Sequence, residues 1–393
     1  MICYTLANTS VEIASKYHDY VKKLMHYSEV EFREIVNRVI IPVSEINNHP
    51  LGGKLLDEFL RGFDKPAQRD IWWSIPTYLR NNYNASWRTF SELDLSMIAL
   101  SDKDNYMGKP LILVWRLSSV DNDVRRDCRL KLTEWGINNP YEYLDLLLYC
   151  ADINDEQIVE DIFAIAYGIA LGKFVQKEYL EKLSSWIVEN VYSEEGLFKY
   201  ENSAIRYYCK GIVKIAISKG LCDAECEKRI SEKYIRKSSF MPAYKDSFDS
   251  KRLSGYGPIY YDLARYVLCD HLDRFFCINY KTREYLRETE KFIEKYKKEY
   301  DVDMLAPEGL IISIAFQYLL NQGWDEKIFW ECEDKNNLGI DICIRNTYMR
   351  STHGAKSKVM TVAEKYVWCV KHRMEADLQV NCSITIMDKV SGI

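Results

Sequence analysis

Between residues 123 and 220 the chain carries a succession of amphipathic helix patterns joined by very short connections. In the first pattern Val124, Cys128 and Leu132 recur at helical spacing, and a later one predicts a helix at Lys177–Asn190. The patterns start near residues 123, 139, 154, 177 and 202. Helices so short and so closely joined must be antiparallel neighbours, and each pair leaves a face for the next pair to cover. The sequence therefore predicts a mainly α fold, an irregular α-solenoid of antiparallel helix pairs.

Capping residues and helix breakers give the expected limits of these helices. Asp123 is the expected N-cap of the first helix, and Gly136 is expected to stop it. Pro140 is placed at the first position of the next helix, where its missing N–H leaves no hydrogen bond unmade. Asn202 is expected to cap the last helix, which Gly220 ends. These capping residues and helix breakers predict separate short helices rather than one long helix.

The N-terminal part also has mostly helical periodicity. We expect helices at Val11–Met25, 29–39 and 53–63. Two stretches rich in Pro, Gly, Asn and Asp interrupt them, and we expect connectors at 41–53 and 64–70.

The pattern changes towards the C-terminus. Residues 307–322 are apolar on nearly every face and are followed by Gly323, so they predict a buried helix. Further on, 340–344 and 380–386 alternate in the manner of strands, on either side of a helix expected near 361–374. This end of the chain is expected to form a small α+β element.

These patterns predict a division of the chain into four parts. Short connections favour a continuous array in the middle, whereas a long polar loop and then a change of periodicity mark later boundaries. The expected parts are an N-terminal helical segment with two connectors at 1–95, a helical-repeat core at 96–237, a continuation of the helical array after the loop at 238–330, and the α+β element at 331–393.

Composition excludes several classes of protein. The chain has 393 residues, of which 47% are hydrophobic, enough for a packed core. Lys and Arg number 53 against 58 Asp and Glu, so the net charge of −5 gives no general attraction to nucleic acid or anionic lipid. With neither a signal-peptide pattern nor a membrane-length apolar run, and with scattered cysteines, we expect a soluble cytoplasmic protein with reduced thiols. Cys222 and Cys226, four residues apart, are interpreted as core cysteines rather than zinc ligands.

Familiar catalytic motifs are missing from the sequence. There is no GxxxxGK[ST], HExxH or GxSxG, so we expect no cofactor and no metal within this chain. The alternative is a metal-dependent nuclease that uses the carboxylates of Asp325 and Glu333 with the ammonium of Lys335. We favour a solvated acidic loop for these residues, because the carboxylates are too close in sequence for the usual pair of strands.

Two further features are candidates for binding a partner. Arg350, His353, Lys356 and Lys358 form a basic loop that could hold a phosphate or an acidic partner, although a solvated connector explains the same composition. The pair Trp72–Trp73 could anchor an interface, but adjacent tryptophans at a helix start more often fill a core seam.

Several segments, taken in order, resemble the helical sensor region of bacterial antiviral STAND NTPases of the AVAST type. They are IPVSEINNHPLGGKLLDEFL (41–60), QRDIWWS (68–74), LVWRLSSVDNDVRRDCRLKL (113–132), ADINDEQIVEDIFAIAYGIAL (151–171), NSAIRYYCKGIVKIAI (202–217), GYGPIYYDLARYVL (255–268), NQGWDEKIF (321–329) and AEKYVWCVKHRM (363–374). The collinear order over about residues 40 to 375 is more specific than any one segment. The chain departs from the family pattern at Ala363 and Glu364, where glycine and lysine are expected, and at Val367, where glutamine is expected.

The resemblance implies a sensor that recognises a viral protein such as a phage terminase or portal. In such proteins recognition drives ATP-dependent homo-oligomerisation and activates an effector. ATP and Mg²⁺ are then expected only in an ATPase part outside this chain. The chain itself would be an excised or split portion of such a protein, or a stand-alone relative. No membrane and no direct nucleic-acid contact are expected. The alternatives are a helical-repeat scaffold for a host protein and, less favoured, the nuclease.

Overall fold

The computed structural model describes residues 2–74, 98–173, 175–231, 294, 297–298, 307–324 and 362–381. These residues are predominantly helical, and no strand occurs among them. No helix in this part of the chain is long and apolar enough to cross a membrane. The chain divides into two compact units: unit 1 comprises residues 1–189 and 208–227, and unit 2 comprises 190–207 and 228–393. The four-part division expected from the sequence stays a prediction.

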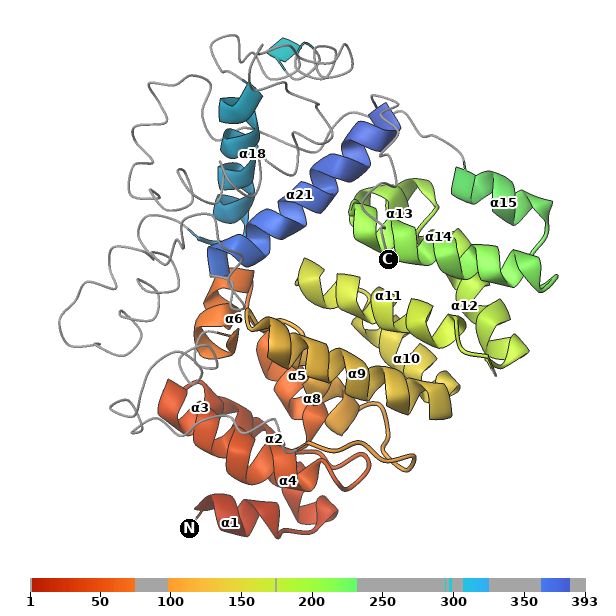
Figure 1. The fold of residues 1–393 in the computed structure, drawn as a ribbon. Coiled ribbons are helices and arrows are strands. Elements are labelled where there is room, and N and C mark those ends of the chain that lie inside the picture. The colour runs from red at the N-terminus through yellow and green to blue at the C-terminus, as the bar shows by residue number, and fades with distance from the viewer. Residues whose placement is uncertain are drawn as a thin grey trace. The chain divides into compact units, whose positions relative to one another are not determined.

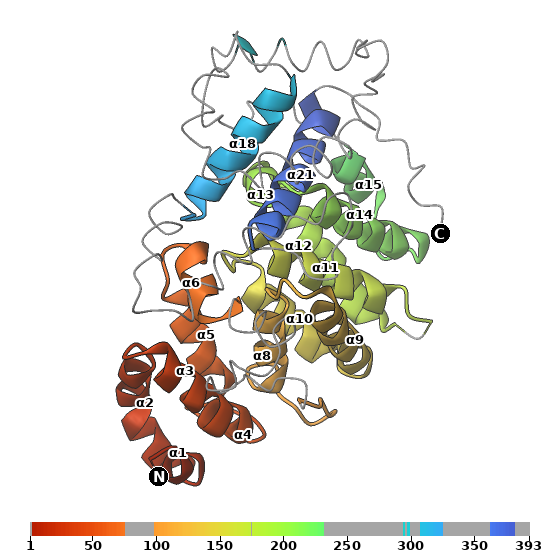
Figure 2. The ribbon, with the colours of Figure 1, turned by 60° about the vertical axis from the view of Figure 1, so that its left-hand side comes forward.

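Unit 1 begins with the helices of residues 2–72 (Figures 1 and 2). Side chains from several of them form an aromatic cluster. The rings of Phe32 and Phe59 stack at 4.8 Å, and Trp72 meets both edge-on at 5.8 Å. Trp73 is buried, so the tryptophan pair fills a core seam as interpreted from the sequence. The elements are α1 (Ile2–Ala7), α2 (Val11–Met25), α3 (Glu29–Ile35), a π-helical segment (Val36–Ile40), α4 (Ile41–Val43), α5 (Gly53–Arg61) and α6 (Pro66–Trp72).

The predictions of the two connectors, at 41–53 and 64–70, are partly wrong. The helix predicted at 29–39 continues through the π-helical segment to Val43, because its apolar residues stay buried beyond the predicted end. The connector predicted at 64–70 contains most of α6. Pro66 occupies the favoured first position of that helix, and burial of Ala67 and Trp73 stabilises it.

The middle of unit 1 is a succession of helices that pack on one another. In Figure 1, α9, α10 and α11 lie side by side, and α8 packs on both α5 and α9. The helix limits at Pro140 and around residue 154 are confirmed, and the prediction of α12 matches to the residue. These elements are α8 (Lys109–Arg116), α9 (Asn122–Asn138), α10 (Pro140–Cys150), α11 (Glu156–Ala170) and α12 (Lys177–Asn190).

The predicted limits of α9 are wrong at both ends. Asp121, not Asp123, is the N-cap, and its carboxylate accepts the Asp123 N–H at 2.9 Å. Gly136 lies inside the helix, which continues to Asn138. The glycine is needed for packing: a Cβ there would lie 2.5 Å from Ile169 Cδ1 and 3.0 Å from the Tyr143 ring.

The remaining described helices follow α12 along the chain: the first, the fourth and the fifth belong to unit 2, and the second and third each cross a boundary between the two units. They are α13 (Glu194–Lys199), α14 (Ser203–Ser218), α15 (Ala224–Ser231), α18 (Pro307–Asn321) and α21 (Val362–Asn381). Asn202 caps α14 as predicted, since its side chain accepts the Ala204 and Ile205 N–H groups. α13, a helix of about a turn and a half that is capped by Ser193, was not among the helices expected from the sequence.

Glycines in the left-handed region end two helices as predicted. Gly220 has φ 70° after α14, and Gly323 has φ 93° after α18. In each case the next N–H returns to a carbonyl five residues earlier, Leu221 to Ala216 and Trp324 to Leu319.

In unit 2, α18 packs on α21. α21 runs to Asn381, so the first two residues of the strand predicted at 380–386 are helical instead. The rest of that strand and the strand predicted at 340–344 lie outside the described residues.

A pair of glycine substitutions tests the packing of α9 against its neighbours. We expect Gly136→Ala to lower the free energy of unfolding by about 1–3 kcal/mol, because the new methyl group overlaps Ile169 and Tyr143. Gly168→Ala in α11 is the matched control: its Cβ would meet Thr133 Cγ2 at an ordinary 3.6 Å, so better helix propensity should stabilise the protein by up to about 1 kcal/mol. Chemical unfolding followed by circular dichroism measures both, and equal effects would contradict the packing described.

Candidate functional site

The residues that the sequence analysis proposed for partner binding or catalysis lie outside the described residues. These are the candidate partner loop, Arg350, His353, Lys356 and Lys358, and the nuclease alternative, Asp325, Glu333 and Lys335. The structure therefore leaves both as predictions. What it does describe is a network of buried polar side chains in unit 1, which we name the polar network. Its members come from α5, α6, α8, α9, α10 and α11 and from the turns that precede α9 and α11.

The first part of the polar network surrounds Asp57 on α5. Its carboxylate is fully buried and accepts the indole N–H of Trp115 at 2.8 Å and the hydroxyl of Tyr149 at 2.6 Å. Arg61, one turn later, donates Nε–H to both oxygens at 3.0 Å and also reaches Asp152 at 2.8 Å. A buried carboxylate needs such donors, because removing the charge from water is costly. Asp57 thus joins α5 to α8 and α10.

The second part is centred on Arg69 of α6, whose side chain is also fully buried. Its Nη2 donates to the carboxylate of Asp155 at 2.8 Å, across 86 residues of sequence. The guanidinium also lies over the Trp115 ring, 5.3 Å from its centroid, where cation–π attraction adds to the ion pair. Asp155 also caps α11, accepting the N–H groups of Gln157 and Ile158. One carboxylate therefore fixes the start of α11 and the position of α6.

Shorter bonds join α6 to the end of α8. The Trp73 indole N–H donates to the Trp115 carbonyl at 2.8 Å, and the Ser118 hydroxyl donates to the same carbonyl at 2.8 Å. The hydroxyls of Ser74 and Ser118 are 3.0 Å apart, and Ser74 donates to Asp70 at 3.0 Å. Two of these bonds therefore bring side-chain donors to the Trp115 carbonyl at the end of α8.

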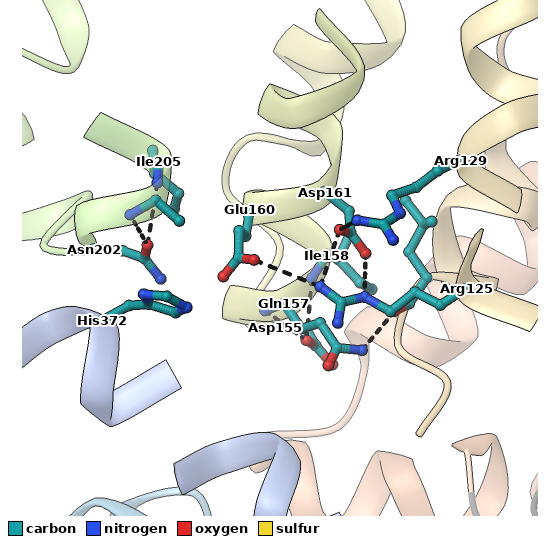
Figure 3. Close-up of polar contacts among 12 residues, drawn as sticks. Arg125, Arg129, Asp155, Gln157, Ile158, Glu160, Asp161, Asn202, Ile205 and His372 are labelled. Atoms are coloured by element: carbon teal, nitrogen blue, oxygen red, sulfur yellow. Dashed lines mark hydrogen bonds and ion pairs between the residues drawn. The ribbon is translucent and has the colours of Figure 1, made fainter. Parts of the chain in front are cut away.

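The third part joins α9 to α11 (Figure 3). The guanidinium of Arg125 forms two hydrogen bonds with Asp161, one of them at 3.0 Å, and Arg129 reaches the same carboxylate at 3.4 Å. Glu160 lies 3.6 Å from Arg125. Burial raises the pKa of Asp161 above its ordinary value, while the two arginines act in the opposite direction. The two-point geometry fixes the rotation of α9 about its axis relative to α11.

Chemically, the polar network is suited to holding helices rather than to catalysis. Each of its buried carboxylates accepts from a guanidinium, a ring N–H or a hydroxyl, so each has a defined structural partner. Nowhere among the described residues do three or more His, Cys, Asp or Glu side chains come close enough to hold a metal ion.

The thiols of unit 1 differ in exposure. Burial raises the pKa of Cys128 to about 12 and also raises that of Cys150 and Cys209, so these thiols stay protonated and unreactive. Cys222 and Cys226 are half-buried, which corrects their interpretation as core residues. Cys222 Sγ donates to the Ser184 hydroxyl at 3.2 Å.

Unit 2 brings together a serine, a histidine and a glutamate, the residue types of a hydrolase triad. Ser203 Oγ lies 3.1 Å from His372 Nδ1 and donates to Glu375 at 2.6 Å. The same Nδ1 contacts Glu375 at 3.0 Å. A triad needs the nucleophile on one ring nitrogen and the carboxylate on the other, with the hydroxyl free of the carboxylate. The arrangement instead makes Glu375 an acceptor for Ser203, His372 and Lys371, the last at 2.8 Å.

The polar network is the feature that residue patterns alone missed. Many of its members, but not Asp57, Arg61 or Tyr149, lie in three of the segments that carry the resemblance to STAND sensors: QRDIWWS (68–74), LVWRLSSVDNDVRRDCRLKL (113–132) and ADINDEQIVEDIFAIAYGIAL (151–171). A usable signal was the presence of Asp and Arg inside otherwise apolar helices, since buried charges are rare unless paired. No protein-family model, curated protein or solved structure matches the chain.

Neighbouring arginines on α9 provide a test of the polar network. We expect Arg125→Met to lower the free energy of unfolding by about 3 kcal/mol, because it removes the main partner of a buried carboxylate. Arg126→Met is the control: that side chain is 65% exposed and pairs with exposed Asp123, so its loss should cost less than about 0.5 kcal/mol. Urea unfolding measures the free energy of unfolding of both variants. Similar decreases in the two would contradict a special role for the buried pair of Arg125 and Asp161.

Glu375 predicts a dependence of stability on pH. Burial opposes ionisation, but His372 and Lys371 outweigh it and lower the pKa of Glu375 from 4.5 to about 2. A lowered pKa in the folded state stabilises the protein above pH 4.5, and the contribution disappears as the pH falls towards about 2. The wild type should therefore exceed Glu375→Gln by about 3 kcal/mol near neutral pH, and by progressively less below pH 4.5.

Thermal and urea unfolding at a series of pH values measures this difference. Glu195→Gln, a change at an exposed glutamate of unit 2, is the control and should follow the wild type throughout. A constant gap between wild type and Glu375→Gln across the acid range would show that the carboxylate charge has no such role.

Proposed function

We propose that this chain is a non-catalytic sensor and interaction module of an antiphage STAND-type defence protein. It binds a viral protein, such as a terminase or portal, and the complex activates an ATPase and an effector located outside this chain. ATP and Mg²⁺ act in that ATPase part, and the full assembly is a cytoplasmic homo-oligomer. The helix pairs of the chain form an irregular α-solenoid with a small α+β element near the C-terminus.

The observation that supports this proposal is that several of the resemblance segments meet in the polar network. Arg69, Trp115 and Asp155 lie in three separate segments and are in direct contact in the fold. Generic helix patterning would place apolar residues at helical spacing but would not pair buried charges across 86 residues. The segments therefore behave as one structural unit, as parts of a single family pattern would.

The physical requirements of a sensor agree with a helical array. Stacked helix pairs present a long surface, and a specific protein interface needs about 800 Å² on each partner. To change an ATPase from mostly inactive to mostly active, the partner must favour the active state by about 5.5 kcal/mol. A protein ligand with a large interface can supply that difference. We place one contact with the viral protein at the predicted basic loop of Arg350, His353, Lys356 and Lys358.

The test is binding by the full chain to a panel of purified phage terminase and portal proteins. We expect one of them to form a complex that survives size-exclusion chromatography. Lys356→Glu with Lys358→Glu should weaken that complex by at least about tenfold, since a charged contact becomes repulsive. Leu130→Ser, a change at an exposed residue of α9, is the control and should bind normally.

The alternatives predict different results. A scaffold for a host protein would bind none of the viral proteins and would bind a host protein instead. A nuclease would cleave DNA in the presence of Mg²⁺ and lose that activity in Lys335→Ala. Either result would overturn the sensor proposal.

A further inference from the structure

Exposed apolar side chains of the described residues concentrate in the first three helices. Nearly half of the large apolar residues that are more than about a third exposed precede residue 31, namely Tyr4, Val11, Ile13, Tyr17, Tyr20, Tyr27 and Val30. Four of these are tyrosines, whose rings give large contact area and whose hydroxyls remain hydrogen-bonded to water before binding. Such a concentration at one end of a unit marks an interaction surface.

The arrangement on α2 is regular. Ile13, Tyr17, Tyr20 and Leu24 follow one another in alternating steps of four and three residues, the spacing of a heptad seam. We name these residues the α2 stripe. Ile13 and Tyr17 are each 48% exposed and Tyr20 is 55% exposed, while Leu24 is half-buried.

The stripe is separate from the face that α2 already buries. Ala14, Val21 and Met25 are fully buried and hold the helix on the rest of unit 1. At 100° per residue, the stripe lies next to this face but does not coincide with it. α2 therefore presents a second apolar face, of the kind that receives a partner helix.

The charges beside the stripe define the chemistry of that partner. Lys16 and Lys23 are exposed and border the stripe on the side of α2 that faces away from the buried residues. Of the other charges of α2, Lys22 pairs with Glu58 at 3.4 Å and Asp19 pairs with His18 at 3.0 Å, whereas Glu12 is exposed one turn before Lys16. Lys16 and Lys23 are the charged residues of α2 nearest the stripe, and they are complementary to acidic residues on an approaching helix.

We propose that the α2 stripe binds an amphipathic α-helix of the partner protein that has a heptad apolar seam and acidic flanking residues. This rests on the proposed function as an interaction module and identifies one of its docking surfaces. A second copy of the chain fits less well, because an antiparallel pairing of two stripes places Lys16 against Lys23 of the copy. An anionic membrane also fits less well, because Glu12 and Asp19 lie on the same exposed side of α2 as the lysines.

The experiment measures binding of the full chain to two fluorescent three-heptad peptides by anisotropy. Both peptides have leucine at the seam positions and differ only in carrying glutamate or lysine at the flanking positions. We expect the glutamate peptide to bind at least about tenfold more tightly than the lysine peptide. Tyr17→Ser with Tyr20→Ser should abolish binding, and Leu130→Ser should leave it unchanged, because Leu130 is exposed on α9.

Charge reversal makes the test specific. In Lys16→Glu with Lys23→Glu the preference should invert, so that the lysine peptide binds more tightly. Equal binding of the two peptides, or no inversion, would overturn the proposal. So would self-association of the wild type, or binding to phosphatidylserine vesicles, that is lost in the tyrosine variant. If the wild type binds neither peptide and the viral complex persists in the tyrosine variant, the stripe is not a docking surface and the sensor function stands.

Discussion

Buried pairing between arginines and carboxylates determines how the helices of unit 1 fit together. Arg69 and Asp155 are both fully buried and meet at 2.8 Å. Two such charges are tolerated in a protein interior only when geometry is good and further donors satisfy the remaining lone pairs, as the α11 N-terminus does for Asp155. The pairing therefore restricts α6, α8 and α11 to one relative arrangement, whereas apolar contacts alone would permit several.

Unit 1 has two kinds of polar side chain, those buried in the polar network and those exposed on the N-terminal helices, and the difference is relevant to function. The buried carboxylates and guanidinium groups of the polar network bind one another, so their role in unit 1 is structural. Tyrosines and lysines of the N-terminal helices are exposed, and it is there that we propose an intermolecular contact. A rigid interior with an adaptable aromatic surface is what a recognition module needs, because little conformational entropy is lost when a partner binds.

Local signals predicted the helices whose limits depend on local chemistry. The limits of α2 and α12 and the glycine cap at Gly220 followed from periodicity, capping and left-handed glycine preference. Gly136 was misinterpreted as a stop, because its reason for being glycine is contact with Tyr143 on another helix.

The site was predictable only in outline. The sequence showed that charged residues occur within apolar helices, but it could not assign Asp155 to Arg69 or Asp57 to Trp115, since spacing along the chain carries no information about such distant pairs. The residues of the predicted basic and acidic loops lie outside the described part of the chain, so their roles stay predictions.

The most direct test of the central claim is a double-mutant cycle on Arg69 and Asp155, measured by equilibrium unfolding. Asp155→Asn keeps a good helix cap and removes only the charge, and Arg69→Met keeps most of the side-chain volume. If the buried pair joins the segments, the two substitutions should be non-additive by more than about 1 kcal/mol. Additivity within about 0.5 kcal/mol would show that the two side chains act independently and that the pairing does not organise the fold.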